Sequence, residues 1–168
     1  MSVLKLVILT LMAATPIALL ADQATVHVEP SNLQRTGRPL QRQTETAAIH
    51  DYLESWQSLQ AALEQNRPGL LGQSFVGTAL DKLTDTMHQQ DAAGIHTRYK
   101  DRAHDLQIVS YSPDVLSIQL IDNVEYDQQV LEHDKVLTTQ RVHARYIVVM
   151  TPAEVRWRVR VFQGEPLQ

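Results

Sequence analysis

Apolar positions in the first half of the chain recur at steps of three and four residues. Over residues 44–65, the side chains that keep this spacing are Ala48, Ile49, Tyr52, Leu53, Trp56, Leu59, Ala62 and Leu63. The spacing predicts an amphipathic helix that begins at Thr44 or Thr46. Residues 70–93 repeat the pattern but contain two interrupting glycines. They predict a short helix, a break and a longer helix that ends at Gly94.

The pattern changes to an alternation of apolar and polar positions after residue 96. Residues 105–111 predict one strand, and residues 115–130, 135–150 and 154–163 predict three longer strands joined by short turns. In the last strand, apolar residues alternate with three arginines, which is typical of a sheet with one packed face and one wet face. Helices followed by a four-stranded antiparallel meander predict an α+β domain whose helices cover one face of a curved sheet.

The stretch "HTRYKDRAHDL", residues 96–106, lies where the helical spacing gives way to alternation. We expect it to be the joint that leads into the first strand. With two helices before this joint and a meander ending in "RWRVRVF" after it, residues 47–162 resemble the nuclear transport factor 2-like superfamily. More narrowly, they resemble domains related to the intermembrane-space region of chloroplast-division proteins. The resemblance implies a cystatin-like cone, in which the inner sheet face and the long first helix enclose a cavity, and a homodimer formed through the sheet.

The alternation also assigns a set of strand residues that point inward, toward the first helix. This set is Leu116, Ile118, Leu120, Asp122, Val124, Tyr126, Ala144, Tyr146, Val148 and Trp157. From it and the helix we expect a ligand-binding pocket lined by Tyr52, Trp56, Asp122, Tyr126, Tyr146 and Trp157. The alternative is that the aromatic residues among these only fill the core.

Asp122 is the only carboxylate in the inward set, and it is the one candidate for catalysis. Burial raises the pKa of a carboxyl group, so Asp122 could act as a general acid or base beside a tyrosine hydroxyl. We expect instead a structural aspartate that is bonded to a nearby arginine or to the backbone. Ketosteroid isomerase and scytalone dehydratase, which belong to the superfamily, use more than one polar residue deep in the cavity. His143 does not add a second polar group here, because it falls on the opposite strand face from Tyr146. The sparse polar content favours a ligand- or protein-binding domain without a cofactor. The alternative is a small cofactor-independent isomerase, dehydratase or hydrolase-like enzyme.

Two further patterns have a chemical and a structural interpretation. Three His-Asp pairs begin at His50, His104 and His133, but they fall on a helix, at a strand start and in a hairpin turn. Because a metal ion needs several ligands within a few ångström, we expect surface residues and no metal site. Five arginines could form an anion-binding strip on the outer sheet face: Arg141, Arg145, Arg156, Arg158 and Arg160. We expect instead a solvated face on which they pair with neighbours such as Gln119 and Glu125.

The amino-terminal residues form a separate segment. Lys5 precedes an uncharged, mostly apolar run that ends at Ala21, so residues 1–21 predict a signal peptide or an uncleaved membrane anchor. Residues 22–43 are expected to be a linker or extension, and residues 44–163 the folded domain. We therefore expect a periplasmic or other extracytoplasmic protein, either secreted or tethered to the membrane.

Composition narrows the partners of this domain. The chain of 168 residues carries a formal net charge of -4, which gives no basic field to attract nucleic acid. It contains no cysteine, which excludes disulfides and thiolate metal sites. The expected partner is an unidentified protein or a small apolar ligand.

Overall fold

The protein is represented by a computed structural model that describes residues 24–31, 33 and 40–167. The predicted signal or anchor segment, residues 1–21, lies outside the described residues, as does part of the predicted linker. Within the described ranges, no helix is both long enough and apolar enough to cross a membrane.

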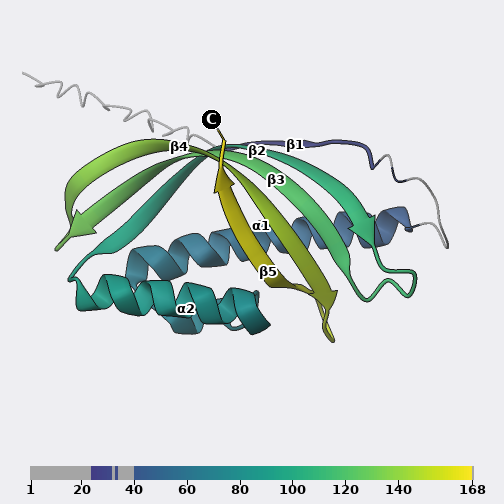
Figure 1. Ribbon diagram of the computed structural model, residues 1–168, viewed down its shortest axis with the longest axis horizontal. Helices are drawn as coiled ribbons and strands as arrows, with labels where there is room; N and C mark the ends of the chain where they lie inside the picture. Colours follow the sequence, from purple (N-terminus) through teal and green to yellow (C-terminus); the bar gives the residue numbers. More distant parts are fainter. Residues whose placement is uncertain (1–23, 32, 34–39, 168) are drawn as a thin grey trace, which may run out of the picture.

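Among the described residues, two α-helices pack on one five-stranded sheet. The helical elements are α1 (Arg42–Gln65), the 3-10 helix η1 (Pro68–Leu71) and α2 (Gly77–Ala92). The strands are β1 (Thr25–Val28), β2 (His96–Tyr111), β3 (Ile118–Glu132), β4 (Lys135–Pro152) and β5 (Trp157–Pro166), and they lie in chain order across the sheet. Figure 1 shows the curved sheet arching over both helices, so the predicted α+β class with helices on one face is confirmed.

The sheet has five strands, where the sequence predicts about four. The additional strand is β1, which comes from the segment expected to be an extension and pairs in parallel with β2 from Ala103 to Leu106. Thr25–Val28 alternates polar and apolar residues, but four positions are too few to give a strong sequence signal. The first helix also begins earlier than predicted, at Arg42, and its N-cap residue Gln41 makes no side-chain capping hydrogen bond.

The polar stretch at residues 96–106 is strand and not a joint. β2 already begins at His96, and its first residues pair with the end of β3, with His96 opposite Leu131. The long β3–β4 hairpin offers hydrogen-bonding partners along this whole length, which overrides the polar composition. The prediction that the strand begins at residue 105 is therefore wrong, whereas Gly94 does end the preceding segment with a positive φ of 68°.

Turns and bulges change which side chains point inward. Leu116 lies in the β2–β3 turn and is 58% exposed, so its assignment to the inward set is wrong. Val155 precedes β5 and is 94% exposed, which breaks the predicted alternation of the last strand. The other strand members of the inward set, from Ile118 to Trp157, are buried or half-buried.

The five arginines do not form one basic strip, because four of them have different partners on different elements. Arg156 pairs with a glutamate of α1, and Arg158 donates to the backbone carbonyl oxygens of Gly72 and Phe75. On the outer sheet face, Arg141 contacts Glu125 and Asp127 and Arg145 donates to Asn123. The expected cross-strand pairing is thus present for the two arginines of β4.

Candidate functional site

Trp56 occupies the middle of the cone interior. It projects from α1 and is only 2% exposed. Five aromatic rings have their centroids between 5.1 and 6.2 Å from its own, those of Tyr99, His104, Tyr126, Tyr146 and Phe162. An indole surrounded in this way fills the space that would otherwise form the cavity of the cone.

A buried polar cluster lies beside this aromatic core. Asp122, on β3, is 0% exposed, and two groups contact the same carboxylate oxygen. The Tyr52 hydroxyl of α1 donates to Asp122 Oδ2 at 2.7 Å, and His104 Nδ1 of β2 lies 2.7 Å from it. The other oxygen, Oδ1, is buried and has no hydrogen-bond partner among the described residues.

A second carboxylate extends the cluster toward the surface. Both carboxylate oxygens of Asp101 lie 2.9 Å from Trp56 Nε1 and accept its hydrogen bond. Its Oδ2 also lies 3.6 Å from His104 Nε2. The side chains of Asp101 and His104 both point inward, because a bulge in β2 between Asp101 and Ala103 shifts the alternation by one residue. The imidazole is therefore held between two carboxylates.

The electrostatics of the cluster follow from this arrangement. Burial alone lowers the pKa of His104, but the hydrogen bonds and charges of Asp101 and Asp122 overcome this effect and raise it to about 9. Burial and the neighbouring Asp122 hold the pKa of Tyr52 well above its ordinary value, so this hydroxyl stays a neutral donor. At neutral pH the histidine is an imidazolium between two carboxylates.

Tyr126, Tyr146 and Trp157, the other predicted pocket residues, form hydrogen bonds with partners other than Asp122. The hydroxyls of Tyr126 and Tyr146 bond to each other at 3.1 Å, and burial raises the pKa of Tyr146 to about 12. Trp157 lies at the start of β5, where its backbone N–H donates to Asp51 of α1. Of the predicted set, Tyr52 bonds to Asp122 directly, and Trp56 joins the polar cluster through its bonds to Asp101. The partners of Asp122 are thus a tyrosine and a histidine, and not the arginine or backbone group expected from the sequence.

A hollow opens next to the cluster, at the edge of the sheet. It has a volume of about 440 Å³ and lies between β1 and α1. Its lining residues are Ala24, Val26, Leu53, Trp56, Gln57, Gln60, Asp101 and His104. A hollow of this size matches the lower range of small-molecule sites.

Similar solved structures have this architecture. The intermembrane space region of chloroplast protein ARC6 is 12% identical, with a TM-score of 0.60 over 77% of this chain and 100% of that chain. The chain has the nuclear transport factor 2-like fold. A putative scytalone dehydratase from Novosphingobium aromaticivorans is 12% identical, with a TM-score of 0.53 over 76% of this chain and 89% of that one. Aln2 from a Streptomyces species is 9% identical, with a TM-score of 0.50 over 77% of this chain and 94% of that one.

These likenesses establish the fold only, as the identities are low. No protein-family model and no curated protein matches the sequence. The function of this nuclear transport factor 2-like domain therefore has to be argued from its own residues.

His104 and Asp101 were missed as members of the site. The sequence interpretation placed His104 at the surface, at the start of a strand, and this is wrong because it is almost fully buried. Extending the alternation of Leu106 and Ile108 backwards would have placed His104 inward. Asp101 could not be found in this way, because the bulge changes the side-chain parity between the two residues.

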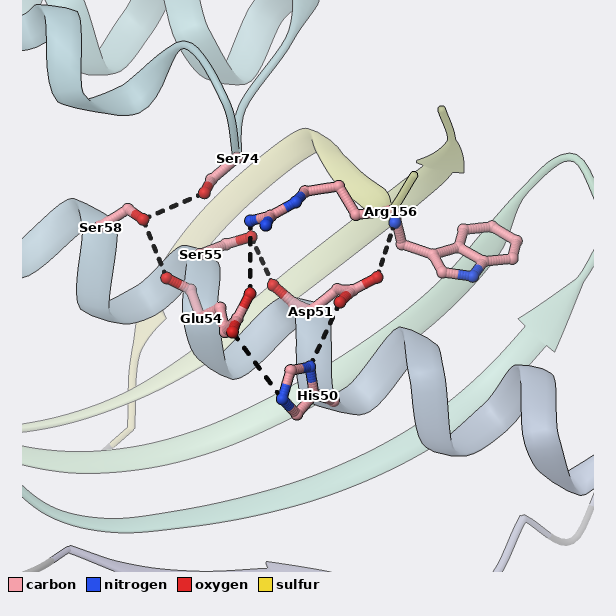
Figure 2. Close-up of polar contacts among 8 residues, drawn as sticks. His50, Asp51, Glu54, Ser55, Ser58, Ser74 and Arg156 are labelled. Carbon is pink, nitrogen blue, oxygen red and sulfur yellow. Dashed lines mark hydrogen bonds and ion pairs between the residues drawn. The ribbon is translucent and has the colours of Figure 1, made fainter. Parts of the chain in front are cut away.

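A second group of polar residues lies on the exposed side of α1 (Figure 2). Potential ligand atoms of His50, Asp51 and Glu54 lie within 4.8 Å of one another. However, Asp51 Oδ2 accepts the N–H of Trp157 at 2.7 Å and Glu54 Oε2 lies 3.3 Å from Arg156 Nη1. These contacts hold the start of β5 against α1, so Asp51 and Glu54 have a structural role.

The three His-Asp pairs do not converge on one another. Of the second pair, His104-Asp105, only the histidine belongs to the buried cluster. The third forms the β3–β4 turn, where His133 and Asp134 have positive φ values of 47° and 65°. The turn assigned to this pair from the sequence is present.

Proposed function

We propose that the chain is an exported, non-enzymatic binding domain, and that the hollow between β1 and α1 receives its ligand or protein partner. The observation that carries the proposal is the position of Trp56. Its indole occupies the centre of the cone and is almost fully buried, as are Tyr52 and Tyr126, so these groups are closed off from a substrate. Acid–base catalysis needs a donor and an acceptor that can reach the reacting atoms. Binding needs only an accessible, partly apolar hollow, which lies outside the filled interior.

Export is the second part of the proposal and rests on the amino-terminal pattern. A basic residue followed by an apolar run over residues 6–21 is typical of a signal peptide or an anchor. The intact mass of the protein from its own cell envelope separates these two forms. A mature chain that starts at Asp22 would exclude the anchor, and a full-length chain in the cytosolic fraction would contradict export.

Native mass spectrometry of the same preparation tests the binding role. We expect an additional mass from a bound molecule or protein partner. The variant Gln57→Trp, at an exposed position of α1 that lines the hollow, should lose this mass because the indole fills the space. Gln89→Trp, at an exposed position of α2, is the matched control and should retain it. Retention of the bound mass by both variants would contradict binding in the hollow.

One observation favours an enzyme as the second candidate. His104 Nδ1 lies 2.7 Å from Asp122 Oδ2, and His104 is also one of the residues that line the hollow. A cofactor-independent isomerase, dehydratase or hydrolase could use such a histidine as a proton donor, with Asp122 to orient it. The neighbouring carboxylate of Asp101 opposes a role as general base, because it favours the charged imidazolium. Turnover of a substrate that His104→Asn abolishes, without loss of folding, would establish the enzyme and contradict the first proposal.

A further inference from the structure

We infer that the hollow between β1 and α1 binds a cationic group on an apolar stem, either a primary alkylammonium or a guanidinium. This inference rests on the proposed binding function and specifies the class of ligand. It differs from the small apolar ligand expected from the sequence. The reason lies in the charges and shape of the hollow, taken together.

The charge at the floor of the hollow is negative. Asp101 is the one carboxylate among the described residues that line it, and its side chain is 16% exposed. Behind it lie the His104 imidazole and the Asp122 carboxylate, so two acidic groups flank one basic group. Arg102, the next residue along β2, is engaged by Asp127 at 2.6 Å on the outer face. A cation placed at Asp101 would therefore meet an excess of negative charge in partly dry surroundings, where attraction is stronger than in water.

The walls of the hollow fit the rest of such a ligand. Ala24, Val26 and Leu53 provide apolar surface, which an alkyl stem of a few methylene groups would cover. Val26 is exposed, although it is apolar. The side-chain amides of Gln57 and Gln60 add carbonyl oxygens that can accept hydrogen bonds from an ammonium or guanidinium group. The hollow thus offers an apolar wall, neutral acceptors and one accessible carboxylate.

The first test compares two probes of the same shape and different charge. Binding of pentylamine and of pentanol to the full chain is measured by isothermal titration calorimetry near neutral pH. We expect the amine to bind at least about tenfold more tightly than the alcohol. Equal binding of the two probes would overturn the inference while leaving a binding function for the hollow. Binding of neither probe would overturn it as well.

Two variants locate the charge that is responsible. Asp101→Asn retains an oxygen that can accept from Trp56 Nε1 but removes the negative charge, so it should weaken amine binding by about tenfold or more. Glu154→Gln, at an exposed position of the β4–β5 turn, is the matched control and should have no effect. Unchanged amine affinity in Asp101→Asn would overturn the inference.

A third variant tests the site without altering the buried cluster. Gln57→Lys places a tethered ammonium beside the hollow at an exposed helix position, so it should compete with the amine and abolish its binding. Gln57→Met, of similar length and without charge, removes one neutral acceptor and should weaken amine binding far less than Gln57→Lys does. Full amine affinity in Gln57→Lys would contradict a cation site here even if Asp101→Asn proves difficult to fold.

The source of the cation is distinguished by a peptide. A capped pentapeptide with a central lysine, compared with the same peptide carrying norleucine, presents the ammonium on an extended backbone. Tighter binding of the lysine peptide than of pentylamine assigns the hollow to a protein segment, and weaker binding assigns it to a small amine. Both results support a cation site, whereas preference for the norleucine peptide would overturn it.

Discussion

The charge state of His104 predicts an unusual dependence of stability on pH. Its pKa rises from 6.5 to about 9 in the folded chain because of Asp101 and Asp122. The folded state therefore binds a proton more tightly than the unfolded state does. The resulting stabilisation is fully present below the unfolded pKa and is lost as the pH rises through the folded pKa. We expect the free energy of unfolding to fall between about pH 6.5 and pH 9.

The size of this effect follows from the shift itself. Each pKa unit corresponds to about 1.4 kcal/mol, so the rise from 6.5 to about 9 corresponds to about 3 kcal/mol of stability. That is a large share of the roughly 5–15 kcal/mol that stabilises a domain. Because His104 is almost fully buried, solvent screening reduces the value little. The chain also has no cysteine, so no thiol titrates in this range.

Urea denaturation at a series of pH values between about 6 and 10 measures the prediction. The variant His104→Asn is the control, since its side-chain amide can still donate to Asp122 Oδ2 but cannot be protonated. The stability of this variant should vary much less over the same range. In the wild type, the His104 resonances should report an imidazolium up to about pH 9. An identical pH slope in both proteins, or a wild type that gains stability toward alkaline pH, would refute the reasoning.

Three further substitutions test other contacts. Gly164→Ala should cost about 1–3 kcal/mol, since the added methyl would lie 2.7 Å from the ring of Tyr146; Gly69→Ala, with nothing within 4 Å, is the control for the same urea measurement. Tyr52→Phe removes the hydroxyl that donates to Asp122 and should lower the free energy of unfolding by about 1–3 kcal/mol. A smaller loss than that of Gly69→Ala would contradict this hydrogen bond. Asp134→Gly relieves the positive φ of the β3–β4 turn and should add up to about 1 kcal/mol, seen as a higher melting temperature; a lower one would argue against the turn geometry.

The fold was largely predictable because its signals are periodic. The helical spacing around Trp56 and the alternation from Ile118 to Tyr126 both extend over several turns or strand positions, and each agrees with the burial observed. The features that could not be predicted are short or irregular. β1 has only four residues, and it joins the sheet through pairing with a partner more than 70 residues away, which no local pattern reports.

The site was predictable only in part, and the reason is the bulge in β2. Alternation alone allows either Asp101 or His104 to face the core, because they are three positions apart. The bulge allows both, and it thereby creates the ion pair between them. Asp122 was found because β3 is regular around it, whereas the inward position of Asp101 depends on an irregularity that leaves no sequence pattern.

The same bulge links the filled interior to the hollow at its edge. By turning Asp101 inward, it supplies the acceptor for the N–H of Trp56, and this bond holds the indole across the middle of the cone. Closing the interior in this way leaves Asp101 as the part of the polar cluster that borders the hollow between β1 and α1. A substitution that removes the acceptor altogether, Asp101→Leu, should therefore act on both spaces at once. It should loosen the indole, seen as a shift in tryptophan fluorescence, and it should abolish amine binding. Asp101→Asn should weaken binding without shifting the fluorescence. If Asp101→Asn and Asp101→Leu changed the fluorescence equally, the proposed coupling between the core and the hollow would be wrong.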